Sequence, residues 1–468
     1  MSLMNKLTRA FGVQDMTVGR PMDTLITFSV PLLIGNFAQQ LYNTVDSIIV
    51  GQYIGDTALA AVGTSGPILN LMLVLFMGIA TGASILSAQF FGAKDRPTLS
   101  KLVGSTFFLT LFSGILMSVI GFFASGFLIG LVHPPENVGT GAVIYLQIIF
   151  IGMLGAAAYN ILSGVLRGMG DSVYPLIFLV IACLLNIFLD ILFVRSFHMG
   201  IAGVAWATII AQAISGILCL IRLLRMSDTI DLNRTTLTPD KRLIVQLCRL
   251  GIPAGITSAI LSLASIIVQN LTNSMGELTI AASVAVMRVD GFAMLPNFTF
   301  GTAATTYVGQ NIGAGKPERI RPGTRDLMKI ALIFAFILVA GILIFGKPLI
   351  SLFTQTETVM DLGALGLRIQ ALGYIAFAVS QVLQGVMRGA GETVIPMWIS
   401  VFTTVVLRMP LAYLIAGLTR SEMYPQGNPI AIFLSLLISW IVAMLLSVWT
   451  FKRGKWKKHL PESMRSLV

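Results

Sequence analysis

Long apolar stretches alternate with short polar segments along the whole chain. Each apolar stretch is long enough to cross a bilayer as a helix, which needs about 20 apolar residues. Several stretches contain Gly and Pro, which membrane-spanning helices tolerate. The pattern predicts an all-α polytopic membrane protein with twelve transmembrane helices, near residues 24–50, 58–90, 99–127, 140–166, 173–195, 200–224, 243–274, 278–311, 327–346, 362–388, 394–417 and 429–451.

The amino-acid composition supports this interpretation. Of the 468 residues, 56% are hydrophobic and only 11% are charged, whereas soluble proteins carry roughly 25% charged residues. Such a composition excludes a water-soluble enzyme with an ordinary surface. The first 22 residues hold several charges and no apolar core, so we do not expect them to be a signal peptide. The three cysteines imply no disulfide framework.

The basic residues favour one side of the membrane. If both termini lie on the same side, that side carries 25 of the 31 Lys and Arg residues and the opposite side carries four. Lys and Arg concentrate in cytoplasmic loops. We therefore expect a multi-pass protein of the cytoplasmic membrane with both termini in the cytoplasm. The net charge of +11 belongs to these loops and does not indicate binding of nucleic acid.

The chain contains an internal repeat. Three pairs of segments match at an offset of 221 or 222: GVLRGMGDSVYP with GVMRGAGETVIP (164–175 and 385–396), AQFFGAKD with GQNIGAGK (88–95 and 309–316), and Pro31 with Pro253. The repeat predicts an N-terminal six-helix lobe, a cytoplasmic linker, a C-terminal six-helix lobe and a basic cytoplasmic tail, at residues 1–225, 226–242, 243–452 and 453–468. Parallel repeats of this kind are pseudo-symmetric and bind substrate near their interface. The alternative is that the duplication only builds a stable bundle.

Several kinds of chemistry are absent from the sequence. The segment GQNIGAGKPE (309–318) resembles a phosphate-binding loop, but Pro317 stands where such a loop needs Ser or Thr for the metal ion. The three histidines show no metal-ligand spacing, and no nucleophile–base pair is evident. We therefore expect neither an enzyme nor a bound cofactor.

Ionisable residues inside a span are costly and are candidates for function. Asp46 and Asp190 lie at similar depths, each a few residues from the outer end of its span, and Asn186 is one turn before Asp190. Thr208 in the next span reaches the same layer. Two carboxylates, an amide oxygen and a hydroxyl suit a hard cation such as sodium, and two close carboxyl groups can also hold a proton. The alternative is that each acid only caps or hydrogen-bonds a broken helix.

The second half of the repeat lacks this polar cluster. The positions equivalent to Asp46, Asn186 and Asp190 are Val268, Leu407 and Leu411. Acids needed only for packing would be expected in both copies, so the difference favours a dedicated ion site in the first half. Asp290 and Arg408 lie deep in spans of the second half, and we interpret them as structural partners of one another or of the backbone. Arg288 is also within a span.

Other polar residues in spans suit the wall of a substrate cavity: Gln39, Tyr42, Asn43, Asn160 and Gln381. The chain also has 22 Met and 28 Phe residues. Flexible thioethers and aromatic faces suit binding of flat amphiphilic cations. Met and Phe at helical spacing are more often lipid-facing or part of a core, so this signal is weak.

The chain resembles the multidrug and toxic compound extrusion (MATE) family over nearly its whole length. The resemblance rests first on two RG-x-G segments, Arg167–Gly170 and Arg388–Gly391. It also rests on the Pro31…Tyr42…Asp46 spacing and on Asn186-x-x-x-Asp190 followed by Thr208. These features look like the DinF-like branch. The NorM-like branch carries acids in spans 7 and 10, and here those spans have none.

The resemblance implies a V-shaped bundle of two lobes that exports organic cations in exchange for sodium or protons. It further implies that Asp46, Asn186, Asp190 and Thr208 are the ion ligands, that Pro31 is a hinge in span 1, and that Tyr42 faces the drug cavity. The expected partners are small organic cations and the lipid bilayer, and we expect a monomer. The choice between sodium and protons and the natural substrate stay open.

A flippase for lipid-linked oligosaccharide is the alternative function. Such a protein needs a basic central cavity for a pyrophosphate group, and only Arg288 and Arg408 could supply it. The sequence therefore favours a cation-coupled antiporter.

Overall fold

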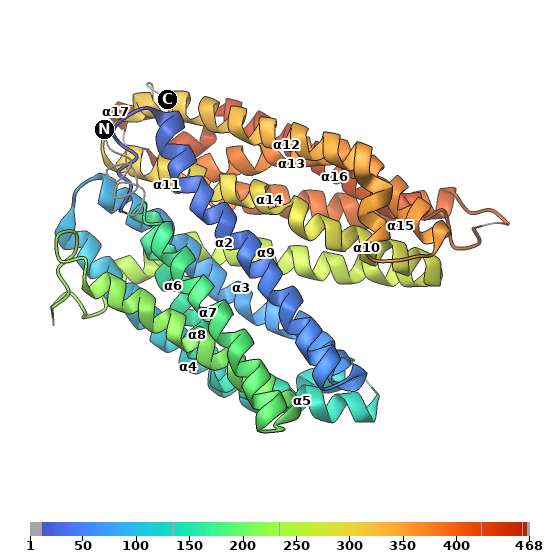
Figure 1. The fold of residues 1–468 in the computed structure, drawn as a ribbon. Helices are drawn as coiled ribbons and strands as arrows, with labels where there is room; N and C mark the ends of the chain where they lie inside the picture. The colour runs from blue at the N-terminus through green and yellow to red at the C-terminus, as the bar shows by residue number, and fades with distance from the viewer. Residues whose placement is uncertain (1–11, 133–134, 234, 423, 461, 466–468) are drawn as a thin grey trace, which may run out of the picture. The chain divides into compact units, whose positions relative to one another are not determined.

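The computed structural model describes residues 12–132, 135–233, 235–422, 424–460 and 462–465 (Figure 1). Lys6 and Arg9 of the N-terminal tail lie outside the described residues. The part of the chain that the structure describes is helical and contains no strand. This confirms the expected all-α class.

The helices of the first repeat copy cover the first six predicted spans. They are α2 (Pro21–Tyr53), α3 (Asp56–Gly92), α4 (Arg96–Val132), α5 (Glu136–Ile151) with α6 (Met153–Gly168), α7 (Val173–Ile191) with the π-helix η1 (Leu192–Ser196), and α8 (Gly200–Leu224).

The helices of the second copy follow the same order. They are α9 (Lys241–Ser274), α10 (Glu277–Ala293) with α11 (Leu295–Gly313), η2 (Pro317–Arg319) with α12 (Ile320–Ser351), α13 (Glu357–Gly389), α14 (Val394–Val401) with the π-helix η3 (Phe402–Arg408) and α15 (Met409–Leu418), and α16 (Ile430–Arg453). Two short helices, η4 (Lys455–His459) and α17 (Glu462–Arg465), follow α16.

Most of these helices are apolar enough to cross a bilayer. Among the described residues, 10 helices pass on length and composition, and the bent pair α5–α6, with an angle of 53°, raises the number to 11. The remaining predicted span is α2, which is 33 residues long but rich in amide side chains. The bend between α5 and α6 falls at Gly152, where a side chain would collide with Ile209 of α8.

The chain forms two compact units. The first comprises Met1–Gly19, Ile26–Gly255 and Gly309–Gly315, and the second comprises Arg20–Leu25, Ile256–Val308 and Lys316–Val468. The first unit thus takes in the start of α9 and the end of α11, both beyond the lobe boundary expected at residue 225. The boundaries that the repeat predicts stay a prediction.

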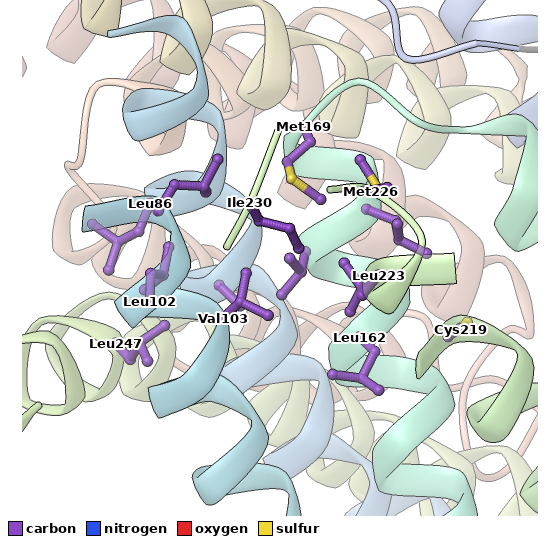
Figure 2. Packing of buried hydrophobic residues seen from close by; sticks show 14 of the residues in the cluster. Leu86, Leu102, Val103, Leu162, Met169, Cys219, Leu223, Met226, Ile230 and Leu247 are labelled. Atoms are coloured by element: carbon purple, nitrogen blue, oxygen red, sulfur yellow. The ribbon is translucent and has the colours of Figure 1, made fainter. Parts of the chain in front are cut away.

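The segment between the two copies is packed against α4 within the first unit. Asp231 forms an ion pair of 2.5 Å with Arg96, and its backbone N–H donates to the Ser100 hydroxyl at 2.8 Å. Met226 and Ile230 are buried in a core cluster with Leu86, Leu102 and Leu223 (Figure 2). The predicted linker is therefore more than a polar tether, because its apolar side chains complete the core.

The best-matching segments of the repeat form the same turn in both copies. Gly170 and Gly391 have φ angles of +91° and +87°, a conformation that favours glycine. The residue after each glycine is a buried acid that accepts backbone N–H groups of the next helix: Asp171 from Tyr174 at 3.2 Å, and Glu392 from Val394 at 3.0 Å. Each copy therefore caps its next helix with a carboxylate.

A basic side chain pairs with each capping acid. Arg222 at the end of α8 lies 3.0 Å from Asp171, and Lys458 of η4 lies 3.3 Å from Glu392. Burial nevertheless raises the pKa of Asp171, which lies in the turn between α6 and α7, although Arg222 acts to lower it. A buried ion pair of this kind positions the turn more than it stabilises the fold.

Equivalent segments of the two copies also contact each other within the first unit. A side chain at Gly92 of α3 would collide with the carbonyl oxygen of Gln310, and a side chain at Gly313 of α11 would collide with that of Gln89. The buried Gln310 side chain accepts from the Met16 N–H at 2.9 Å and donates to the Gly168 carbonyl at 3.2 Å. The end of α11 is thereby held against α3 and the N-terminal segment.

We predict that Gly313→Ala lowers the melting temperature of the protein in detergent, measured by scanning fluorimetry. The added methyl group meets a backbone carbonyl that cannot rotate away, and such overpacking costs about 1–3 kcal/mol. Gly341→Ala in α12 is the matched control, because a Cβ there meets nothing within 4 Å and Ala favours a helix by about 1 kcal/mol over Gly. Equal melting temperatures for the two variants would show that the α3–α11 contact is not tightly packed.

Candidate cation site

Three helices of the first unit bring the predicted ion ligands together. α2 carries Asp46, α7 carries Asn186 and Asp190, and α8 carries Thr208. Asn186 and Asp190 are fully buried, and Thr208 is 9% exposed. Each of the three helices thus contributes one or two polar side chains to a single layer.

Direct contacts connect the members of this cluster. The Asn186 amide donates to the Thr208 hydroxyl at 3.4 Å, and that hydroxyl donates to the Val204 carbonyl at 3.0 Å within α8. The carboxyl groups of Asp46 and Asp190 are close enough to interact electrostatically.

Four oxygen atoms of the cluster lack a hydrogen-bond donor among the described residues. Oδ1 of Asp46, Oδ1 of Asn186 and both carboxylate oxygens of Asp190 are buried and have no hydrogen-bond partner among the described residues. A buried charge without a partner costs several kcal/mol or changes its protonation state. The cluster therefore offers four oxygen atoms that a cation or a proton would satisfy. Their chemistry fits a hard cation, which prefers carboxylate and carbonyl oxygen ligands.

Two tyrosines border the cluster. Tyr42 lies one turn before Asp46 on α2 and is close to Asp46 and Asp190. Tyr145 of α5 is 5% exposed and lies close to both acids. The sequence does not single out Tyr145, since a tyrosine in an apolar span carries no pattern that distinguishes it from a packing residue.

The other predicted cavity residues lie in different surroundings. Gln39 and Asn43 of α2 are exposed, whereas Asn160 is half-buried and donates to the Ala156 carbonyl of its own helix at 2.9 Å. Gln381 belongs to α13 in the second unit, where it lies beside Gly301. Their assignment to a substrate cavity stays a prediction, and so does the assignment of Pro31 as a hinge. Pro31 lies inside the continuous helix α2.

The second unit contains a separate polar group. The Tyr374 hydroxyl donates to the Asp290 carboxylate, and Arg408 at the end of the π-helix η3 is near enough to interact with Asp290 electrostatically. These two described residues form no ion pair, and the Arg408 Nε is buried without a partner. The expected Asp290–Arg408 pair is thus replaced by a hydrogen bond from Tyr374, which takes the position beside the carboxylate.

Comparisons with known proteins identify the family. The MatE family model matches the chain twice, at residues 31–192 and 253–414. The two matches are offset by 222 residues and fall on the two copies of the repeat.

Two proteins of Bacillus subtilis, both named as probable multidrug resistance proteins, are similar over nearly their whole length. YpnP is 31% identical over 95% of this chain and 97% of its own, and YoeA is 30% identical over 92% and 93%.

A solved structure shares the fold. It is a transporter of the MOP superfamily from Pyrococcus furiosus, which superposes with a TM-score of 0.88 over 97% of this chain and 98% of its own at 23% identity. That protein is described as having a binding pocket of reverse polarity, which suggests a different function for it. Because the family model covers both copies of the repeat and the relatives align over almost the entire chain, this protein belongs to the MatE family of membrane transporters, the family that its motifs resemble.

Proposed function

We propose that the protein is an antiporter that exports amphiphilic organic cations across the cytoplasmic membrane in exchange for sodium ions or protons. The observation that carries the proposal is the set of buried oxygen atoms without donors at Asp46, Asn186 and Asp190. The names of the relatives support the drug-exporting part, since YoeA and YpnP are both called probable multidrug resistance proteins.

Cation binding would change the forces between α2 and α7. Without a cation, two ionised carboxylates at Asp46 and Asp190 repel each other across a medium of low dielectric constant. A bound sodium ion or a shared proton removes this repulsion and holds the two helices together. Pro31 removes one backbone hydrogen bond from α2, so the helix can bend there when the site empties. Pro31 would then be the hinge.

Coupling follows if the exported molecule and the cation favour opposite conformations. Each then weakens binding of the other by the same factor, so the inward cation gradient can drive export. Tyr42 and Asn43 lie within one turn of Asp46 on α2, which would link a substrate at this helix to the ion site. Both termini would lie in the cytoplasm, as the distribution of basic residues indicates.

No observation favours the flippase. A pyrophosphate would need basic residues that face a cavity, but Arg288 is exposed on α10 and Arg408 lies near the Asp290 carboxylate. The first unit presents acids instead of bases at its candidate site.

The coupling role is tested with Asp46→Asn and Asp190→Asn, which keep side-chain size and remove charge. Each is expected to abolish export driven by the cation gradient in proteoliposomes, while drug binding in detergent survives. Thr208→Val removes one neutral ligand, so apparent ion affinity should fall by about tenfold. Gradients of sodium alone and of pH alone, applied to the wild type, identify the ion.

Asp361→Asn is the matched control, since Asp361 is 61% exposed and pairs with Lys347 outside the cluster. It is expected to leave ion-dependent export unchanged. In the wild type the ion should weaken drug binding, and this antagonism should be lost in both cluster variants. Full ion-dependent export by Asp46→Asn and Asp190→Asn would refute the site.

The orientation is tested by labelling single cysteines in a background without Cys183, Cys219 and Cys248. Ser227→Cys lies in the linker and Arg420→Cys in the segment between α15 and α16, and both positions are exposed. A membrane-impermeant thiol reagent should label Arg420→Cys in intact cells and Ser227→Cys only after permeabilisation. The reverse pattern would overturn the proposed orientation.

A further inference from the structure

The exposed side chains along one face of the end of α16 change from aliphatic to aromatic to basic. Leu445 and Trp449 are 56% and 55% exposed, and Arg453 follows at the same four-residue spacing, so all three lie on one side of the helix. The opposite side is buried through Ala443 and Ser447. An exposed aliphatic residue, then tryptophan, then arginine is the order expected where a helix leaves the hydrocarbon core and enters the headgroup layer.

The residues after α16 are folded back against the helix. Gly454 has a φ of +69° and ends α16, and the fully buried Trp456 stacks on Phe451 with ring centroids 5.2 Å apart. The Trp456 Nε1–H also donates to the Phe451 carbonyl at 3.0 Å. The tail therefore holds Lys455 close to the end of α16.

The end of α16 and the following residue Lys455 also carry cations that form no ion pair among the described residues. Lys458 pairs with Glu392 and Arg465 with Glu462. Lys452, Arg453 and Lys455 are exposed, and no ion pair joins them to an acid in the described part of the chain. The Arg453 guanidinium lies over the Trp449 ring, 4.9 Å from its centroid. This contact orients one of the three cations at the level of the ring.

We propose that Lys452, Arg453 and Lys455 bind the phosphate groups of anionic phospholipids, with the Trp449 ring at headgroup depth beside them. We call these four residues the tail patch. An anionic lipid matches both the apolar and the basic part of this surface, because its acyl chains would cover Leu445 and its phosphate would contact the cations. A soluble phosphate would satisfy only the cations, and a nucleic acid would leave the apolar part exposed. Each Lys or Arg near an anionic membrane surface contributes about 1 kcal/mol.

Native mass spectrometry of the purified full-length protein tests the proposal by counting retained lipids. The wild type should retain phosphatidylglycerol in preference to phosphatidylcholine. Each single substitution Lys452→Gln, Arg453→Gln or Lys455→Gln should weaken phosphatidylglycerol binding by about fivefold, and the triple variant should lose the preference. Trp449→Leu keeps an apolar side chain but removes the ring, so it should cause a partial loss.

The matched control is the triple variant Lys241→Gln, Arg242→Gln and Arg249→Gln, which removes three exposed charges at the start of α9. No exposed tryptophan accompanies those charges, so the lipid preference should persist. Equal losses in the two triple variants would show that lipids respond only to net charge and would overturn the proposal. So would an unchanged preference in the tail-patch variant, or displacement of the lipid by equimolar inorganic phosphate. All the substituted residues are exposed, and transport is not part of the measurement, so the result is independent of the proposed function.

Discussion

Inside a bilayer no water is available to satisfy a polar group, so each one must find its partner within the protein. Many hydroxyl groups in the described helices meet this requirement by donating to a carbonyl one turn earlier, as Thr208 does to Val204 and Thr272 to Val268. The oxygen atoms of Asp46, Asn186 and Asp190 do not meet it. Single buried hydroxyl groups elsewhere in the described residues, such as those of Ser87 and Ser283, also lack a partner, but the cluster gathers four such oxygen atoms in one layer of the first unit. The proposed cation-coupled antiporter would need such a place, because a fully satisfied cluster would have no reason to bind an ion.

The two copies of the repeat have the same turn before the helices α7 and α14 but different polar side chains within their spans. Gly170 with Asp171 and Gly391 with Glu392 form the same helix end and the same acidic cap. Within its spans the first copy has an acidic cluster, whereas the second has Asp290 hydrogen-bonded to Tyr374 with Arg408 nearby. The shared turns fix where each helix begins. They leave the side chains in the middle of the spans free to take on separate tasks.

The sequence predicted the helices because their apolar stretches are long, and it predicted the acidic cluster because ionisable side chains in such stretches are rare. It could not predict features that depend on a neighbour distant in sequence. The close contact at the Gly152 bend involves Ile209 on another helix. The packed linker reflects the burial of Met226 and Ile230 in a segment that is otherwise polar. Tyr145 escaped notice because its proximity to the acids depends on how α5 packs. The Asp290–Arg408 pair was expected from depth alone, and depth does not identify the side chain that approaches closest.

The reciprocal contact of Gly92 with Gln310 and of Gly313 with Gln89 also limits how the gene can change. Each glycine is fitted to a main-chain carbonyl contributed by the other copy, and a main-chain carbonyl moves only with the backbone that carries it. A mutation that enlarges either glycine therefore cannot be compensated by a nearby change in its own copy. After the duplication, the mid-span residues could diverge one at a time, but these two glycines could not. The two halves of the gene therefore stay constrained by one another at these two codons, even though the polar residues of their spans differ.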